Sequence, residues 1–103
     1  MNSLDDILLL QKNWNGYGAE PFSEKHVDFV SDLIERMPCR PDVFPTGRKS
    51  IQLEFYNGNA YLEFEIFENE KIHLYIQHSD GREQEGIIQK EYVNDIIKEF
   101  FRV

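Results

Sequence analysis

The stretch that decides the fold is Ile51-Gln52-Leu53-Glu54-Phe55-Tyr56-Asn57-Gly58-Asn59-Ala60-Tyr61-Leu62-Glu63-Phe64-Glu65-Ile66-Phe67. Apolar and polar residues alternate on both sides of Asn57-Gly58, which is the period of a strand with one buried face. Asn-Gly is a strong hairpin signal because both residues tolerate positive φ. We expect two antiparallel strands joined by a two-residue turn at 57–58, which pairs Leu53 with Leu62. This register places the apolar residues of both strands on one face.

The same alternation continues after this hairpin. A third strand is expected from Lys71 to about Gln77, after a three-residue loop at 68–70 that keeps the faces matched. Asp80-Gly81 marks another turn, and Glu85–Ile88 predicts a fourth, shorter strand. The connector at 38–49 is expected to hold a short extended piece at Val43-Phe44.

Helical patterns flank the strands. The first predicted helix runs from Leu4 to about Lys12 with Ser3 as its cap, and the second begins after Ser23 and ends before Pro38. The last runs from about residue 90 to 101, with an apolar stripe at helical spacing. We therefore expect one α+β domain over residues 1–103, an antiparallel three- to four-stranded meander. The N-terminal helix pair and the C-terminal helix are expected to pack on one face.

Composition narrows the class of protein. The chain has 103 residues, 41% hydrophobic and 14% aromatic, which is enough apolar material for one core. Its formal net charge of -8 argues against a nucleic acid or an anionic membrane as partner. No apolar run reaches the length of a membrane span, and the start does not have the pattern of a secretory signal. Cys39 is the single cysteine, so no internal disulfide forms, and we expect a cytoplasmic protein.

The polar face of the predicted sheet is the first candidate site. It gathers carboxylates and aromatic rings, and its candidate residues are Glu54, Tyr61, Glu63, Glu65, His73 and Tyr75. An ordinary solvated face, a contact surface, and a metal or acid–base site are the three interpretations. A flat face offers no concave pocket, so we expect no metal, no cofactor and no catalytic residue there.

The loop Asn13-Trp14-Asn15-Gly16-Tyr17-Gly18-Ala19-Glu20-Pro21 is the second candidate site, through Trp14, Tyr17 and Glu20. Its glycines permit unusual backbone angles and allow the rings to pack over the sheet edge. The rings either close the end of the core or present a binding site. The Trp14 indole N–H then needs an acceptor, which a backbone carbonyl or a Glu side chain can supply. His26 and His78 are expected to be surface residues.

The segment around this loop resembles a group of small, uncharacterised bacterial proteins. Those proteins carry Asn-Trp-Asp/Asn-Gly-Tyr-Gly-Ala before a helix, as Asn13–Ala19 do here, and the similarity extends to Pro45-Thr46-Gly47 and Ile51–Phe55. It covers roughly the first two-thirds of the chain. The group looks like cargo of mobile genetic elements, such as integron cassettes or phage-linked islands. The resemblance implies an accessory bacterial role and supplies no activity and no catalytic residues.

Three function classes stay open. The leading hypothesis is a non-catalytic protein-interaction module whose partner is a basic protein or a second copy of the chain. The first alternative is an antitoxin- or immunity-type protein that neutralises a basic toxin, which fits the net charge of -8. The second is a small-molecule binder or minor enzyme that uses the Trp14 loop and the acidic sheet face. Whether the protein is an enzyme stays undecided, with the residue pattern favouring a non-enzyme.

Overall fold

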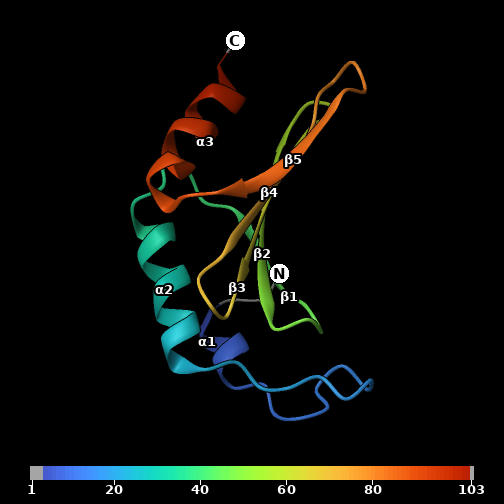
Figure 1. The fold of residues 1–103 in the computed structure, drawn as a ribbon, viewed down its shortest axis with the longest axis vertical. Coiled ribbons are helices and arrows are strands. Elements are labelled where there is room, and N and C mark those ends of the chain that lie inside the picture. The colour runs from blue at the N-terminus through green and yellow to red at the C-terminus, as the bar shows by residue number, and fades with distance from the viewer. Residues whose placement is uncertain (1–3, 103) are drawn as a thin grey trace.

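The computed structural model describes residues 4–102, which form an α+β fold (Figure 1). Five antiparallel strands make a meander in the order β1-β2-β3-β4-β5, with two helices before it and one after it. The elements are α1 (Leu4–Leu8), α2 (Glu24–Glu35), β1 (Asp42–Pro45), β2 (Ser50–Asn57), β3 (Ala60–Phe67), β4 (Ile72–Gln77), β5 (Glu83–Ile88), the short 3₁₀-helix η1 (Lys90–Tyr92) and α3 (Val93–Phe101). None of the helices in the described part of the chain is long and apolar enough to cross a bilayer.

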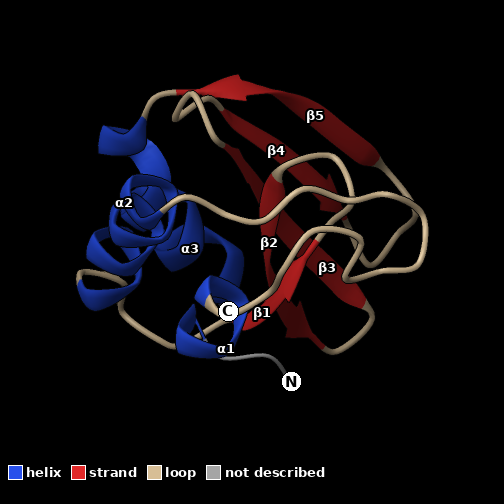
Figure 2. Ribbon diagram, turned by 90° about the horizontal axis from the view of Figure 1, so that it is seen from below, coloured by secondary structure: helices blue, strands red, loops and turns tan. Residues whose placement is uncertain are grey.

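The helices lie on one side of the sheet and leave its other face open (Figure 2). Each central strand alternates between buried and partly exposed residues, so its apolar side chains meet the helices. The fully buried core residues come from both layers and include Ile7, Val30, Ile51, Leu53, Leu62, Phe64, Ile66 and Ile97. This confirms the prediction of helices over the Ile51 face, and it makes the opposite face the exposed one.

The sheet has five strands, so the expected three or four is wrong. The extended piece at Val43-Phe44 is part of a complete edge strand, β1, which pairs with β2. The last strand begins at Glu83 rather than Glu85. Both edges were underestimated because their sequences carry short or charged segments with little apolar alternation.

The turn of the β2–β3 hairpin lies one residue later than predicted. Asn57 pairs with Ala60, so Gly58 and Asn59 form the turn, and Gly58 has a φ of +59°. A glycine at the first turn position is the pattern of a type II′ hairpin. Pairing therefore shifts by two residues, and Leu53 lies opposite Phe64 instead of Leu62. A shift of two keeps every side chain on its predicted face.

The shift changes the neighbours on the open face. Glu54 lies opposite Glu63, not Tyr61, and Gln52 lies opposite Glu65. The predicted β3–β4 register is confirmed, with Glu63 opposite Tyr75 and a loop at 68–70.

The helix boundaries differ from the predictions at two ends. Ser23 caps α2 as expected, since its side chain accepts a hydrogen bond from the His26 N–H at 3.1 Å. α2 ends at Glu35, before Pro38 as expected. However, α1 ends at Leu8 instead of near Lys12, and α3 begins at Val93, after η1, instead of near residue 90. The predicted cap of α1, Ser3, lies outside the described residues.

His26 is buried, which corrects its expected position on the surface. Its side chain is 1% exposed, and its Nε2 lies 2.9 Å from the backbone oxygen of Ile66. It stands next to Val27 and one helical turn before Val30, so it belongs to the core-facing stripe of α2. Because the carbonyl can only accept, Nε2 donates, and this bond ties α2 to the end of β3.

Candidate functional site

Three tyrosines form a row across the open face of the sheet, which we call the tyrosine ladder. Tyr56 of β2 and Tyr61 of β3 are direct cross-strand partners with ring centroids 5.1 Å apart. The ring of Tyr75 on β4 lies 6.1 Å from that of Tyr61. Both pairs are tilted and lie within the range of favourable aromatic contacts. The ladder therefore runs across three adjacent strands.

Each tyrosine of the ladder donates a hydrogen bond to a glutamate. Tyr61 reaches Glu63 at 2.6 Å and Tyr56 reaches Glu54 at 3.1 Å. Tyr75 donates to Glu83 of the neighbouring strand β5. These bonds hold three carboxylates beside three aromatic rings.

The carboxylates also make the phenols harder to ionise. Burial, followed by the hydrogen bond to Glu63, raises the pKa of Tyr61 far above the ordinary 10.0. The hydrogen bond to Glu83 is the main cause that raises the pKa of Tyr75. The pKa of Tyr56 is raised by burial and then by the bond to Glu54. All three hydroxyls therefore stay protonated donors at neutral pH.

The charge of the open face is strongly negative. By strand register, the side chains that share this face with the ladder include six acids: Asp42, Glu54, Glu63, Glu65, Glu83 and Glu85. We call the tyrosine ladder and these six acids the acidic face. Two basic groups lie against it: Arg48 pairs with Glu65 at 2.8 Å, and the His73 ring lies 3.3 Å from Glu85. Glu54, Glu63 and Glu83 make no ion pair within residues 4–102.

Glu65 differs from the other acids because it is only 7% exposed. Its Oε2 accepts hydrogen bonds from Arg48 and from the Ser50 hydroxyl, which lies 2.5 Å away. The Ser50 hydroxyl also lies 2.5 Å from that of Thr46. The Glu65 carboxylate therefore uses its hydrogen bonds to hold the β1–β2 turn against β3, and little of its acceptor capacity is left for a binding partner.

The loop at 13–21 separates its two aromatic residues. Trp14 is half-buried against Phe22, with ring centroids 6.0 Å apart, and its Nε1 donates to the backbone oxygen of Glu20 at 3.1 Å. Of the two acceptors that the sequence left open, a backbone carbonyl or a Glu side chain, the structure has the backbone carbonyl. Tyr17 is 92% exposed, so it does not pack over the sheet edge as expected. The Glu20 side chain pairs with Lys12 at 3.7 Å.

Asparagine side chains fix the shape of this loop. Asn13 Oδ1 accepts a bond from the Gly18 N–H, and Asn15 Oδ1 accepts bonds from the N–H groups of Tyr17 and Ala19. Asn15 also packs against the β1–β2 turn, since a Cβ on Gly47 would lie 2.8 Å from its Nδ2. The loop thus contacts the β1–β2 turn, whose Arg48 pairs with Glu65.

The chemistry that this arrangement supports is the binding of cations by charge and by aromatic faces. Within residues 4–102, no group of three His, Cys, Asp or Glu side chains is placed to hold a metal ion. Each carboxylate of the ladder accepts a tyrosine hydroxyl and keeps further acceptor capacity for a cationic group.

Sequence reasoning missed four members of the acidic face: Tyr56, Asp42, Glu83 and Glu85. Tyr56 lies on the polar face of β2, but it was left out because it directly precedes the predicted turn at 57–58. Asp42 was missed because only Val43-Phe44 was expected to be extended. Glu83 and Glu85 were missed because β5 carries little apolar alternation. The signal for all four was the alternation of side chains along each strand. Once β1 pairs with β2, Asp42 lies opposite Glu54. Once β5 pairs with β4, Glu85 lies opposite Tyr75 and Glu83 opposite Gln77.

Comparison with known proteins gives no further guide: no family model, curated protein or solved structure matches this chain.

Proposed function

We propose that this protein is a non-catalytic interaction module that binds a basic protein through its acidic face. The observation that carries the proposal is the tyrosine ladder, bordered by carboxylates that lack cationic partners. Glu54, Glu63 and Glu83 each accept a bond from a tyrosine and make no ion pair within the described chain.

Lysine and arginine side chains fit this surface in two ways. A cation over a tyrosine ring gains roughly 0.5–2 kcal/mol, depending on how far it is desolvated. The neighbouring carboxylate then offers a charge-assisted hydrogen bond. Because the tyrosine hydroxyls already orient the carboxylates, these side chains lose little conformational entropy when a partner binds. The net charge of -8 adds long-range attraction for a basic partner.

A basic partner fits better than a second copy docked face to face. Two acidic faces in contact would bring like charges together, which is unfavourable in a desolvated interface. If the basic partner is a toxin, the module acts as an antitoxin or immunity protein, and this remains the specific alternative. An accessory role on a mobile bacterial element agrees with either form.

The test is affinity capture from a native-host lysate with three baits. The first is the wild type, and the second is Glu54→Gln/Glu63→Gln/Glu83→Gln, in which each amide oxygen still accepts the tyrosine hydroxyl. The control is Asp28→Asn/Asp32→Asn/Glu35→Gln, which removes the same charge from α2 on the helical side. Basic proteins held by wild type and control, and lost by the ladder variant, support the proposal.

Two outcomes overturn it. Equal capture by all three baits would show that the acidic face is not the contact surface. Captures without any basic protein, at low ionic strength where charge attraction is strongest, would remove the proposed partner class.

A further inference from the structure

Strand β5 lies at one edge of the sheet and leaves one side of its backbone without a neighbouring strand (Figure 2). Hydrogen-bonded and non-hydrogen-bonded pairs alternate along an antiparallel ladder. The His78 N–H donates to the Arg82 oxygen at 2.8 Å, and this bond sets the alternation for the rest of the β4–β5 pair. Glu83, Glu85 and Ile87 therefore point their backbone N–H and C=O groups away from β4. Within residues 4–102, no backbone partner lies on that side.

The side chains of the same three residues lie on the open face of the sheet. Glu83 accepts the Tyr75 hydroxyl and Glu85 lies beside the His73 ring, and both contacts use Oε1. The second oxygen of each carboxylate is left for a further donor. Ile87 is 58% exposed and adds an apolar position to the row. An added strand would therefore meet one apolar and two acidic side chains along the edge.

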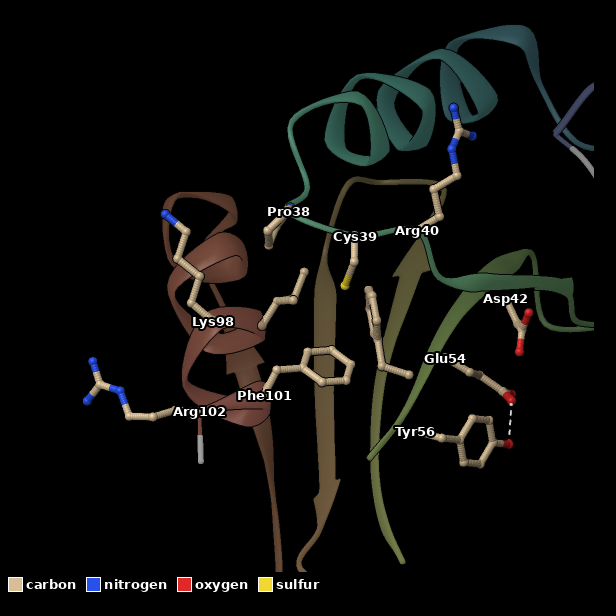
Figure 3. A pocket seen from close by; sticks show the side chains of 11 residues that line it. Pro38, Cys39, Arg40, Asp42, Glu54, Tyr56, Lys98, Phe101 and Arg102 are labelled. Atoms are coloured by element: carbon tan, nitrogen blue, oxygen red, sulfur yellow. Dashed lines mark hydrogen bonds between the residues drawn. The ribbon is translucent and has the colours of Figure 1, made fainter. Parts of the chain in front are cut away.

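The opposite edge of the sheet offers less to an added strand. The Thr46 N–H donates to the Ser50 oxygen, so by the same alternation Val43 and Pro45 of β1 face outward. Proline has no N–H, which leaves this short strand with a single outward donor. Beside β1 lies an apolar pocket, and the basic side chains of its rim direct their charged ends away from it (Figure 3). Backbone pairing and charge both favour β5 as the edge for a basic segment.

We propose that β5 accepts an extended segment of a basic partner protein as an added antiparallel strand. This inference rests on the proposed function, because it states how the basic partner is held beside the acidic face. Antiparallel pairing continues the arrangement of the sheet and is slightly more stable per residue than parallel pairing. In strand addition, main-chain hydrogen bonds supply affinity and alternate side chains supply specificity.

The register predicts a sequence pattern for the added segment. In an antiparallel pair, the residue opposite Ile87 comes first, and those opposite Glu85 and Glu83 follow at steps of two. The segment therefore has an apolar residue, with lysine or arginine at the second and fourth positions after it. Opposite charges at directly facing positions stabilise a sheet, and like charges destabilise it. The edge thus favours a basic strand over β5 of a second copy.

The probe is the peptide acetyl-Thr-Val-Thr-Lys-Thr-Lys-Thr-amide, titrated into the purified protein by calorimetry at low ionic strength. We expect saturable binding that is about fivefold weaker in Glu83→Gln/Glu85→Gln. The control Asp28→Asn/Asp32→Asn removes the same charge from α2 and should bind the peptide like wild type.

Two methylated peptides separate strand pairing from attraction by charge. Methylation of the backbone nitrogen of the first lysine removes an N–H that faces β5, opposite Glu85, and should weaken binding at least about tenfold. Methylation of the threonine before it changes an N–H that faces away from β5. That peptide has the same charge and should bind like the unmodified one.

Amide hydrogen exchange detects the same pairing on the protein. In the free protein, the N–H groups of Gln84 and Gly86 face β4 and should exchange slowly, while those of Glu83, Glu85 and Ile87 exchange fast. The bound peptide should slow exchange in the second set at least about tenfold.

Equal binding of the two methylated peptides would overturn strand addition, because charge alone would then hold the peptide. Absence of binding, equal weakening in both charge variants, or unchanged exchange at the outward-facing residues of β5 would also overturn it. These results leave the capture experiment intact, since that experiment identifies which proteins the acidic face holds. Captures without any basic protein remove the proposed partner class whatever the peptide does.

Discussion

Tyr61 links the chemistry of the acidic face to the stability of the fold. Its pKa is raised above 10.0 by burial and by its bond to Glu63, so the folded state holds the phenol proton more tightly than the unfolded chain does. This contribution is complete below pH 10 and is lost as pH rises toward the folded-state value. We predict that the free energy of unfolding falls with pH between about 10 and 11.5, and falls less steeply in Tyr61→Phe.

Urea denaturation at several pH values measures this slope. Tyr17→Phe is the matched control, because Tyr17 is 92% exposed, and its slope should equal that of the wild type. The hydrogen bond lost in Tyr61→Phe lowers the free energy of unfolding by the same amount at every pH, so it does not change the slope against pH. Identical slopes in all three proteins would show that the Tyr61–Glu63 pair does not stabilise the protonated phenol.

His26 shows where reasoning from single residues fails. A polar residue in the first turn of a helix is usually exposed, and the sequence does not show that β3 ends beside this turn. The buried bond from His26 to the Ile66 oxygen depends on packing between residues 40 positions apart. Local patterns carry no information about such a contact, whereas they did identify the Ser23 cap, whose partner lies three residues away.

At the level of elements, alternation was sufficient to predict which side chains share a face. The β2 and β3 patterns gave the open face correctly even though the turn lay one residue later, because a pairing shift of two preserves the faces. The ladder itself was harder to foresee. It depends on which residues lie directly opposite each other, and therefore on the exact turn and on β5.

Glu65, which contacts the β1–β2 turn, is a second residue whose surroundings the alternation did not predict. From the strand pattern alone it is one more acid on the exposed face. The structure instead buries it beneath Arg48, whose side chain is 63% exposed. Removing Arg48 would leave the Glu65 side chain, 9% exposed, without a cationic partner and with the Ser50 hydroxyl as the remaining hydrogen-bond donor to its Oε2. We predict that Arg48→Ala lowers the free energy of unfolding by about 1–3 kcal/mol.

Arg82→Ala is the matched control for this prediction. Arg82 pairs with Asp80 at the same distance of 2.8 Å, but both side chains are more than half exposed. Water replaces such a partner, so Arg82→Ala should lower the free energy of unfolding much less than Arg48→Ala does. Chemical denaturation measures both variants, and equal losses would mean that the burial of Glu65 adds nothing to its pair.

At the scale of the whole molecule, two glutamates of the sheet belong both to the acidic face and to the exposed edge of the sheet. Glu83 and Glu85 belong to the acidic face, and they also lie on β5, the edge strand beyond which no strand follows. An open edge is a template for pairing with another chain, and Ile87, 58% exposed, adds apolar surface to it. Charged side chains on an edge strand oppose such pairing.

Antiparallel pairing of β5 with β5 of a second copy would place four carboxylates at neighbouring positions on one face. Like charges opposite each other in a sheet cost roughly 0.2–1 kcal/mol per pair. We predict that the wild type stays monomeric in sedimentation equilibrium, whereas Glu83→Thr/Glu85→Thr dimerises as its concentration rises. Asp28→Thr/Asp32→Thr removes the same charge from α2 and should stay monomeric. A wild-type dimer, or a β5 variant that remains monomeric at every concentration, would show that these glutamates do not control the edge, and their place in the acidic face would then serve partner binding alone.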